Sequence, residues 1–450
     1  MKTTLWMFAL LLVMTQIAMA GGPLVVGGPA FGKDGEAFVW DASAFPIKYR
    51  VDGGAMSAIV DNATGLARVQ SMFNNWQVPS ASITYSYAGP IQAAGAFLGG
   101  DVRTVAQFNA VYGSCNDGQQ SPIIFDVDGT IVAGLGLDPD IIGFASPCDV
   151  DAASGHILTG FALLNGRFQD GLNNSSNYEL TTAQFDEAIT HELGHFSGLD
   201  HSQINVDVLY NQQPNNCNTD SLAGLPLMFP YAYCQSRSSV GLPIVSADDV
   251  AWISKLYPAS SFATAYGTIS GSILFSDGIT GAQGVNVIAR RVDDTGTTQD
   301  ESLRIAASVV SGFKFTGNPG QSVTGTNTGG DQTGSRTPAL IGYFEIPVPA
   351  GTYTLQVESV NSQFTSGSGL GPLDPPVPMP GGIPKFWNSH QSAFNDPKDK
   401  ETITVAPGQT VHGINIILNG TQPRFDQFED GGSELRAPRV LPVDGEAVSA

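Results

Sequence analysis

Charged residues are scarce in this chain of 450 residues, and the basic ones are the scarcest. Asp, Glu, Lys and Arg make up 14% of the sequence, against about 25% in an average soluble domain. The chain has 20 basic and 41 acidic residues, which gives a formal net charge of −21 at pH 7. A surface of this sign repels nucleic-acid phosphates and anionic lipid headgroups. We therefore expect no nucleic-acid partner.

Long apolar runs are missing after residue 20, so we expect no segment that spans a membrane. The first 20 residues combine the basic Lys2, an apolar run over Leu5–Met14 and the small-residue sequence Ala18-Met19-Ala20. This order is typical of a secretory signal peptide that is cleaved before Gly21. An N-terminal membrane anchor, the alternative, needs about 20 apolar residues. We accordingly expect a secreted, extracellular protein.

Cysteine is also sparse, and no C-x-x-C spacing supports a cysteine-based metal site. Four cysteines are present: Cys115, Cys148, Cys217 and Cys234. An even number in an exported chain indicates two disulfides, for which three pairings are possible. We favour Cys115–Cys148 and Cys217–Cys234, because each of these pairs closes one short loop. Each bond would add about 3 kcal/mol by restricting the unfolded chain.

Hydrophobic residues make up 42% of the chain, enough for a packed core, and the length predicts about two or three domains. Apolar residues recur at steps of three and four from Ile59 to Trp76, as on one face of a helix. A second helix should begin near Thr181, which forms a capping-box pair with Gln184, and a third should begin after Ser246. Strands are expected at residues 46–51, Ser82–Tyr87, Ile123–Val127, Ile141–Ala145 and Ile157–Leu164.

Helical periodicity disappears after about residue 262, and short strands between Gly and Pro turns predict an all-β sandwich. We divide the chain into a signal peptide (1–20), a first domain (21–260), a β-sandwich domain (263–420) and an acidic polar tail (421–450). The second domain has its own strand pattern, so we expect the two to fold independently. Its strands are expected at Gly267–Phe275, Val285–Arg290, Gly342–Pro347, Thr352–Val357, Thr402–Val405 and Gly413–Leu418.

The segment H-E-L-G-H-F-S-G-L-D-H, residues 191–201, holds three of the six histidines. His191 and His195 are four residues apart, so on a helix both imidazoles project from one face toward a single tetrahedral zinc. Glu192 lies between them, where its carboxylate can act as a general base on a metal-bound water. Gly198 lets the chain turn back. His201 then becomes the third ligand and leaves a fourth position open for water, as catalysis requires.

The pattern H-E-x-x-H-x-x-G-x-x-H resembles the metzincin signature of zinc peptidases. Three further features look most like the matrixins among them: Ser202 after the third histidine, the sequence L-M-F-P around Met228, and the closing helix over residues 246–257. The resemblance covers roughly residues 40–260. It implies an α+β catalytic domain with a mixed twisted sheet and about three helices, and it implies that Met228 forms a Met-turn beneath the zinc.

The chain also departs from the matrixin pattern in two places. Ala232 stands where matrixins have a tyrosine, so the wall of the primary specificity pocket differs. No cysteine precedes Cys115, so the cysteine-switch propeptide is absent. The resemblance further places a strand with Gly143, Phe144 and Ala145 at the sheet edge above the active-site helix, where an extended substrate would pair with it. A buried interior strand is the alternative.

Two further expectations concern ligands and the C-terminal region. Stretches such as G-Y-F-E-I-P-V-P-A-G-T-Y-T-L resemble the carboxypeptidase-regulatory-like, transthyretin-like sandwich. A group of aspartates could bind structural Ca²⁺ through carboxylate oxygens, although Asp in Gly-rich turns is also common without a metal. These residues are Asp126, Asp128, Asp138, Asp140, Asp149 and Asp151.

Together these features predict a secreted zinc-dependent endopeptidase that acts on protein or peptide substrates. A zinc-bound water would attack the peptide bond while Glu192 serves as the general base. We expect the protein to be a monomer. Two alternatives stay open: a non-catalytic secreted adhesion or matrix-binding protein with a structural zinc, which has no need of Glu192, and a hydrolase of a non-peptide bond.

Overall fold

The computed structural model describes most of the chain in a series of segments. Three of the expected features lie outside them: the signal peptide, the pair Cys217–Cys234 and the acidic tail. Within the segments, none of the helices combines the length and the apolar character that crossing a bilayer requires. The described segments are residues 21–173, 178–202, 204, 219–230, 235–298, 300–315, 334–335, 337–359, 385–395 and 397–420.

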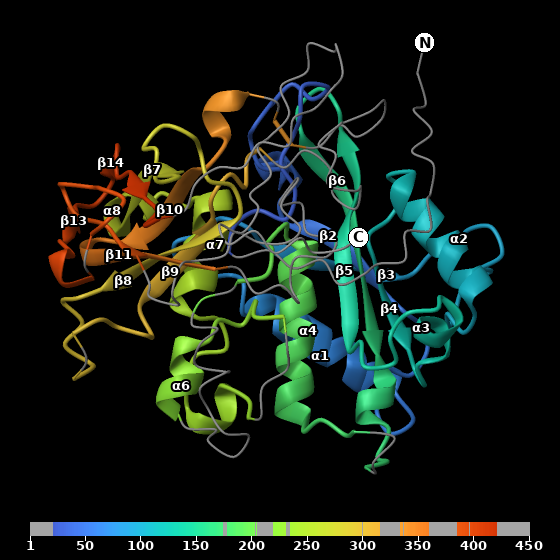
Figure 1. Ribbon diagram of the computed structural model, residues 1–450. Coiled ribbons are helices and arrows are strands. Elements are labelled where there is room, and N and C mark those ends of the chain that lie inside the picture. Colours follow the sequence, from blue (N-terminus) through green and yellow to red (C-terminus); the bar gives the residue numbers. More distant parts are fainter. Residues whose placement is uncertain are drawn as a thin grey trace, which may run out of the picture.

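The N-terminal part is built on a six-stranded mixed sheet with helices on both faces (Figure 1). The strand order is β1-β6-β4-β2-β3, with β5 antiparallel to β6 and the other pairs parallel. The strands are β1 (Val39–Trp40), β2 (Ile47–Val51), β3 (Tyr85–Pro90), β4 (Pro122–Asp126), β5 (Gly143–Asp151) and β6 (His156–Asn165). The helices are α1 (Asn62–Asn74), α2 (Val105–Asn116), α3 (Thr130–Gly134), α4 (Thr182–Phe196), α6 (Thr219–Gly224) and α7 (Ala247–Leu256).

Both faces of this sheet are buried, as the side chains of β6 show. Phe161 and Leu163 belong to the apolar cluster that contains residues of α2 and α3. Ala162 and Leu164, which point the other way, belong to the cluster that contains residues of α1, α4 and α7. Successive side chains of a strand alternate between the faces, so a strand covered on both sides is apolar throughout. The sheet is therefore the middle layer of three.

The expected helices and strands of this part are confirmed, with shifted ends. Thr181 caps α4 and Ser246 caps α7, each through a complete capping box. The first helix begins at Asn62 rather than Ile59, and the Ile59 side chain is 64% exposed. Helix α2 was not expected, because the charge-poor segment before Asn116 shows no clear apolar stripe. The structure is thus a mixed fold of several sheets and few helices.

The C-terminal part consists of two smaller sheets. One has the order β10-β7-β14, with β15 also paired to β7; the other has the order β12-β11-β8-β9, with β13 paired to β11. The elements are α8 (Phe262–Ala265), β7 (Tyr266–Leu274), β8 (Val285–Arg291), β9 (Ala306–Val310), β10 (Tyr343–Pro349), β11 (Gly351–Ser359), β12 (Lys385–Phe386), β13 (Ile403–Val405), β14 (Thr410–Val411) and β15 (Ile416–Ile417). Strand β9 and the short helix α8 were not expected. Short 3-10 helices occur at Ala42–Ala44, Gly166–Gln169, Ser238–Val240, Pro338–Leu340 and Pro397–Asp399.

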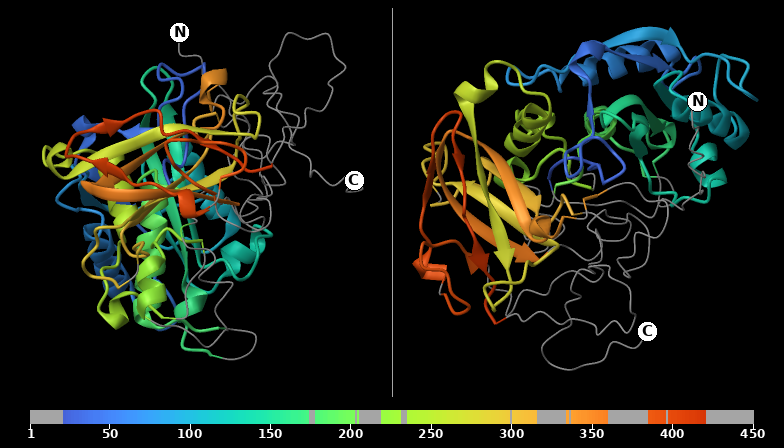
Figure 2. Two further views of the ribbon diagram at one scale, coloured as in Figure 1. Left: turned by 60° about the vertical axis from the view of Figure 1, so that its left-hand side comes forward. Right: turned by 90° about the horizontal axis from the view of Figure 1, so that it is seen from above.

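The two parts lie side by side and share one apolar core. Figures 1 and 2 show the strands coloured yellow to red on one side of the molecule and the blue-to-green sheet on the other. Helix α7 lies between them, and its Trp252 packs edge-on against Phe313, with ring centroids 6.1 Å apart. One continuous cluster of buried residues runs from Leu193 of α4 through Ile253 of α7 to Phe344 of β10. The expectation that the two parts fold independently stays a prediction.

A disulfide between Cys115 and Cys148 joins α2 to β5, as the sequence predicted. The two residues are 33 positions apart, and Cys115 is fully buried. Beside this bond, the Thr159 hydroxyl of β6 donates a hydrogen bond of 2.6 Å to the Cys115 carbonyl. The disulfide therefore ties helix α2 to β5, the edge strand of the sheet.

Replacing Cys115 and Cys148 together with alanine should lower the free energy of unfolding by about 3–4 kcal/mol, because the unfolded chain then loses the constraint of a loop this long. Urea denaturation of the purified variant and of the wild type, followed by circular dichroism, measures this difference. A denaturation midpoint equal to that of the wild type would contradict the expectation.

Candidate metal centre

The candidate site begins with helix α4, whose start is fixed by local hydrogen bonds. The Thr181 hydroxyl accepts from the Gln184 N–H at 3.2 Å, and the Gln184 side chain accepts from the Thr181 N–H at 3.1 Å. Two amides that the first helical turn leaves unpaired are satisfied in this way. The helix then carries His191, Glu192 and His195 within its last two turns.

The end of α4 is a glycine turn that redirects the chain toward the third histidine. Gly198 has a φ of +88°, a left-handed conformation that glycine adopts without steric cost. Its N–H donates to the His195 carbonyl at 2.9 Å, and the Leu199 N–H donates to the Gly194 carbonyl at 3.0 Å. These two bonds form a Schellman motif. His201 follows three residues after the turn and comes back over the helix end.

The three imidazoles converge on one point. The Nε2 atoms of His191, His195 and His201 lie 3.1 Å from one another in each of the three pairings. Zinc–nitrogen bonds of about 2.0–2.1 Å in a tetrahedron separate two ligand nitrogens by about 3.3–3.4 Å. The arrangement thus has the size of a three-histidine metal site, and among the residues described here it is the one His, Cys, Asp and Glu group able to hold an ion.

The other ring nitrogens show which tautomers are present. Nδ1 of His191 lies 2.8 Å from the Leu227 carbonyl oxygen, and Nδ1 of His195 lies 2.8 Å from the Leu199 carbonyl oxygen. A carbonyl oxygen can only accept, so both Nδ1 atoms carry the proton and both Nε2 atoms present a lone pair. Two lone pairs at 3.1 Å repel each other unless a cation lies between them. The donor set therefore fits a metal ion.

Burial keeps these imidazoles neutral. Desolvation lowers the pKa of His191, and desolvation together with the neighbouring His191 lowers the pKa of His195 to about 3. A neutral imidazole is the form that binds a metal. At neutral pH the site accordingly needs no proton release from these two rings before an ion binds.

The loop that contains Met228 packs against α4 and supports the site. Both carboxylate oxygens of Asp249 accept from this loop, from the Leu227 N–H at 2.8 Å and from the Met228 N–H at 3.0 Å. The Met228 carbonyl accepts from the Ser202 N–H at 2.7 Å. The Met228 side chain is buried against Gly194 of α4, where any larger residue would collide with its sulfur. Asp249 thus holds the carbonyl of Leu227 in place for His191.

The N-terminal segment supports the turn between α4 and His201. The Leu24 N–H donates to the Gly198 carbonyl at 2.8 Å, and the Asp200 N–H donates to the Gly22 carbonyl at 3.0 Å. Pro23 and Leu199 form an isolated antiparallel bridge between these bonds. The carbonyl that orients His195 belongs to Leu199, so the segment at residues 22–24 fixes its position.

Glu192 follows His191 on α4, and its carboxylate is buried. Its side chain is 6% exposed, and its Oε2 has no hydrogen-bond partner among the described residues. Burial raises the pKa of Glu192 to about 8. A cation held by the histidines would favour the ionised carboxylate and lower this pKa.

Strand β5 passes directly beside Glu192. In the described part of the chain it pairs with β6 alone, so its other edge is open. A Cβ atom at Gly143 would lie 2.8 Å from Cγ of Glu192 and 2.9 Å from the Leu163 carbonyl oxygen. Glycine at this position gives the Glu192 side chain its room. Phe144 and Ala145 continue the strand as residues of intermediate exposure.

The aspartates proposed as calcium ligands mainly close turns. Asp126 accepts from the N–H groups of Ile131 and Val132 at 3.1 and 2.8 Å, and Asp128 accepts from the Thr130 N–H. Asp138 and Asp151 likewise accept from backbone amides two or three residues on. Among the residues that the structure covers, none of these carboxylates joins a group of metal-ligand geometry.

Sequence reasoning missed three groups that build the site. The carbonyls of Leu227 and Leu199 carry no side-chain signal, and Asp249 has the sequence position of a capping residue in the helix that begins after Ser246. Ala232, at which the chain departs from the matrixin pattern, lies outside the described residues.

Replacing Gly198 with alanine should lower the free energy of unfolding by about 1–2 kcal/mol, the cost of a left-handed conformation for a residue with a Cβ atom. Gly113 is the matched control, because it lies inside α2 and a Cβ there meets nothing within 4 Å. Gly113→Ala should stabilise the protein by up to about 1 kcal/mol through helix propensity. Thermal unfolding of both variants checks the pair, and equal shifts would contradict the assignment.

Comparison with known proteins does not identify this site. No model of a protein family matches the chain, and no curated protein matches it. The three histidines, the buried carboxylate of Glu192 and the open edge of β5 are therefore the observations from which a function has to be inferred.

Proposed function

We propose that this protein is a secreted zinc-dependent endopeptidase with a matrixin-like catalytic part. The observation that carries the proposal is the convergence of three imidazole Nε2 atoms, 3.1 Å apart, beside a buried glutamate. A structural zinc site is usually closed by four protein ligands, whereas three leave a position open. Within the described residues, no fourth His, Cys, Asp or Glu side chain joins the three histidines, so a fourth position would be available to water or substrate. The neighbouring glutamate supplies a general base, which a structural zinc site does not need.

Zinc held by His191, His195 and His201 would act as a Lewis acid on the scissile carbonyl and would make water a better nucleophile near neutral pH. Glu192 would take the proton from the attacking water and deliver it to the leaving amine. Its Oε2 is buried without a hydrogen-bond partner in the described part of the chain, so it has capacity for such a proton. Neutral His191 and His195 stay fixed by their Nδ1–H bonds throughout.

The substrate would bind as an extended strand along the open edge of β5. Backbone groups of Gly143, Phe144 and Ala145 would pair with the peptide, which is a common way to bind an extended chain. This edge passes Glu192, because Gly143 leaves room for that side chain. A peptide bond lying on the strand would thus be within reach of both the metal and the carboxylate.

The rest of the chain is consistent with this proposal. The Cys115–Cys148 disulfide suits an oxidising compartment, in agreement with secretion after removal of the signal peptide. The two C-terminal sheets, which share an apolar core, fit the transthyretin-like sandwich that the sequence resembles. The proposal for the N-terminal part rests on the metzincin-like pattern over residues 191–201.

Replacing Glu192 with alanine should lower peptide hydrolysis by about 10²–10⁴-fold, which is the contribution of a general base, and should leave zinc bound. Replacing His201 with alanine should instead weaken zinc binding itself. Turnover of a quenched-fluorescence peptide library and elemental analysis of the purified proteins measure the two effects.

The same two measurements also distinguish an endopeptidase from a non-catalytic adhesion protein. A wild-type protein that binds zinc but cleaves no peptide in the library would favour the non-catalytic adhesion protein. A Glu192→Ala variant with wild-type turnover would show that another group is the base.

Replacing Gly143 with alanine should lower kcat about tenfold or more while zinc stays bound, since a misplacement of about 1 Å in a catalytic group costs up to about 10²-fold. The added Cβ would press on Glu192 and on the Leu163 carbonyl, neither of which binds the metal. Zinc content measured on the same preparation is the internal control. Unchanged kcat would mean that β5 does not position Glu192.

A further inference from the structure

Strand β9 of the C-terminal part is attached to helix α7 through the backbone of a single residue. The Ser308 N–H donates to the Asp248 carboxylate at 2.9 Å, and the Ser308 carbonyl accepts from Trp252 Nε1–H at 2.8 Å. Ser308 is fully buried, and Asp248 and Trp252 are each 3% exposed. Buried backbone groups at the edge of a sheet need partners, and here both partners come from the N-terminal part.

The same turn of α7 also supports the segment after the third histidine, and it does so through Met228. Asp249, the neighbour of Asp248, accepts from the Met228 N–H at 3.0 Å, and the Met228 carbonyl accepts from the Ser202 N–H. Burial raises the pKa of the Asp248 carboxyl, and a side-chain hydrogen bond from Ser202 acts in the opposite direction, toward the charged form. Ser202 directly follows His201, so the carboxylate that holds β9 also holds the residue next to a ligand.

Two contacts also link the ligand loop directly to the C-terminal sheet. The hydroxyl oxygens of Ser202 and Ser308 lie 3.4 Å apart, and both residues are fully buried. Two residues further on, Ile204 forms a separate apolar cluster with Ile288 of β8 and Ala306 of β9. The chain that leaves His201 is therefore fixed on this sheet at two successive points.

We propose that the C-terminal β region is a structural component of the metal centre, in which β9 positions His201 through Asp248 and Ser202. Asp248 and Ser308 are positioning residues and touch no reacting atom. Without β9, Ser202 and Ile204 would lose the surface on which they pack, and the third ligand would lose its fixed place. This inference rests on the metal binding proposed above but not on peptide hydrolysis.

The test compares zinc affinity among full-length variants by competition with a chromophoric chelator. Asp248→Ala removes the acceptor for both Ser308 and Ser202, and it should weaken zinc binding by about 10–100-fold, as loss of a group that orients a ligand does. Burial raises the pKa of Asp248 to about 8, so a neutral amide suits this position. Asp248→Asn keeps an acceptor oxygen and should restore the affinity to within about threefold of the wild type.

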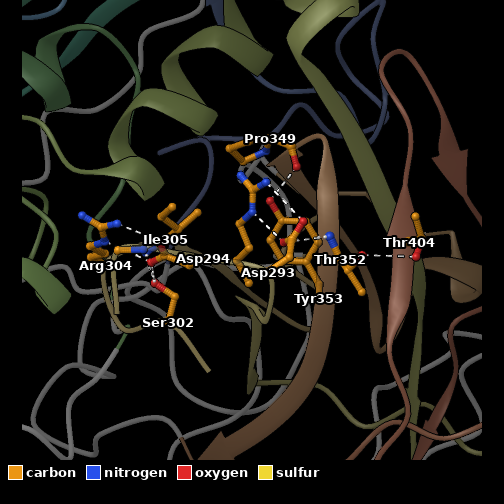
Figure 3. A network of polar contacts seen from close by, with 11 residues as sticks. Asp293, Asp294, Ser302, Arg304, Ile305, Pro349, Thr352, Tyr353 and Thr404 are labelled. Atoms are coloured by element: carbon orange, nitrogen blue, oxygen red, sulfur yellow. Dashed lines mark hydrogen bonds and ion pairs between the residues drawn. The ribbon is translucent and has the colours of Figure 1, made fainter. Parts of the chain in front are cut away.

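The control variant lies in the same C-terminal part but away from α7. Asp294 accepts from the Ser302 hydroxyl at 2.6 Å and from Arg304 Nε and Nη2 at 3.0 and 2.7 Å, in the polar network of Figure 3. Asp294→Ala should lower the melting temperature without changing zinc affinity. A general loss of stability is separated from the positioning of His201 in this way.

Each outcome of these measurements supports or overturns the role of β9 in positioning His201. Asp248→Ala with wild-type zinc affinity, or Asp294→Ala with an equal loss of affinity, would overturn the proposal. If Asp248→Ala does not fold, Trp252→Phe replaces it, because this change removes the donor to the Ser308 carbonyl while an aromatic ring stays at the position, and it should also weaken zinc binding. A wild-type protein that binds no zinc would overturn the metal centre itself, whereas unchanged affinity in the variants would overturn only the role of β9.

Discussion

The site depends on two hydrogen bonds that aim imidazole rings at a common point. Each runs from an Nδ1–H group to a backbone carbonyl, from His191 to Leu227 and from His195 to Leu199. They fix the tautomer, so both Nε2 lone pairs face the third ring. The two carbonyls belong to segments that the helix does not contain. The positions of these segments are therefore as important to the site as the helix itself.

This requirement explains much of the surrounding structure. The Leu199 carbonyl is placed by the Schellman turn at Gly198 and by the bridge from the N-terminal segment. The Leu227 carbonyl is placed by Asp249, whose carboxylate accepts two successive amides of that loop. The end of α4 is held in turn by Trp40, whose indole N–H donates to the Phe196 carbonyl, and by Tyr257, whose hydroxyl donates to the Ser197 carbonyl. Every one of these partners is buried, so none of the bonds competes with bulk water.

Local signals in the sequence were enough for the helix and its two histidines. The spacing of His191 and His195, the capping residue Thr181 and the turn at Gly198 all act within a few residues, and the structure agrees with each of them. The disulfide Cys115–Cys148 was also predicted from spacing alone. Helix α2 and strand β9 were not predicted, because their apolar residues follow no clear period and tertiary packing decides their conformation.

The two parts share a core because α7 carries apolar residues around most of its circumference, a feature that is visible in the sequence. The expected boundary lies where the helical pattern stops, near residue 262, but α7 before it is buried on more than one face. Ala251, Trp252 and Ile253 follow one another and are 0%, 3% and 0% exposed. Three consecutive residues on a helix span most of its circumference, so such a helix needs cover from two sides. The N-terminal part with α4 supplies one side, and the C-terminal strands supply the other.

A shared core and a shared helix have a consequence for how the molecule is built. An edge strand such as β9 would offer unpaired N–H and carbonyl groups to other chains if nothing covered it. Here α7 covers it with an indole donor and a carboxylate acceptor, and the same helix fixes the loop beneath the three histidines. Protection of the strand and support of the ligands thus depend on one ten-residue helix. Asp248 accepts from Ser308 of β9 and its neighbour Asp249 accepts from Met228, so a displacement of the first turn of α7 would disturb both contacts together.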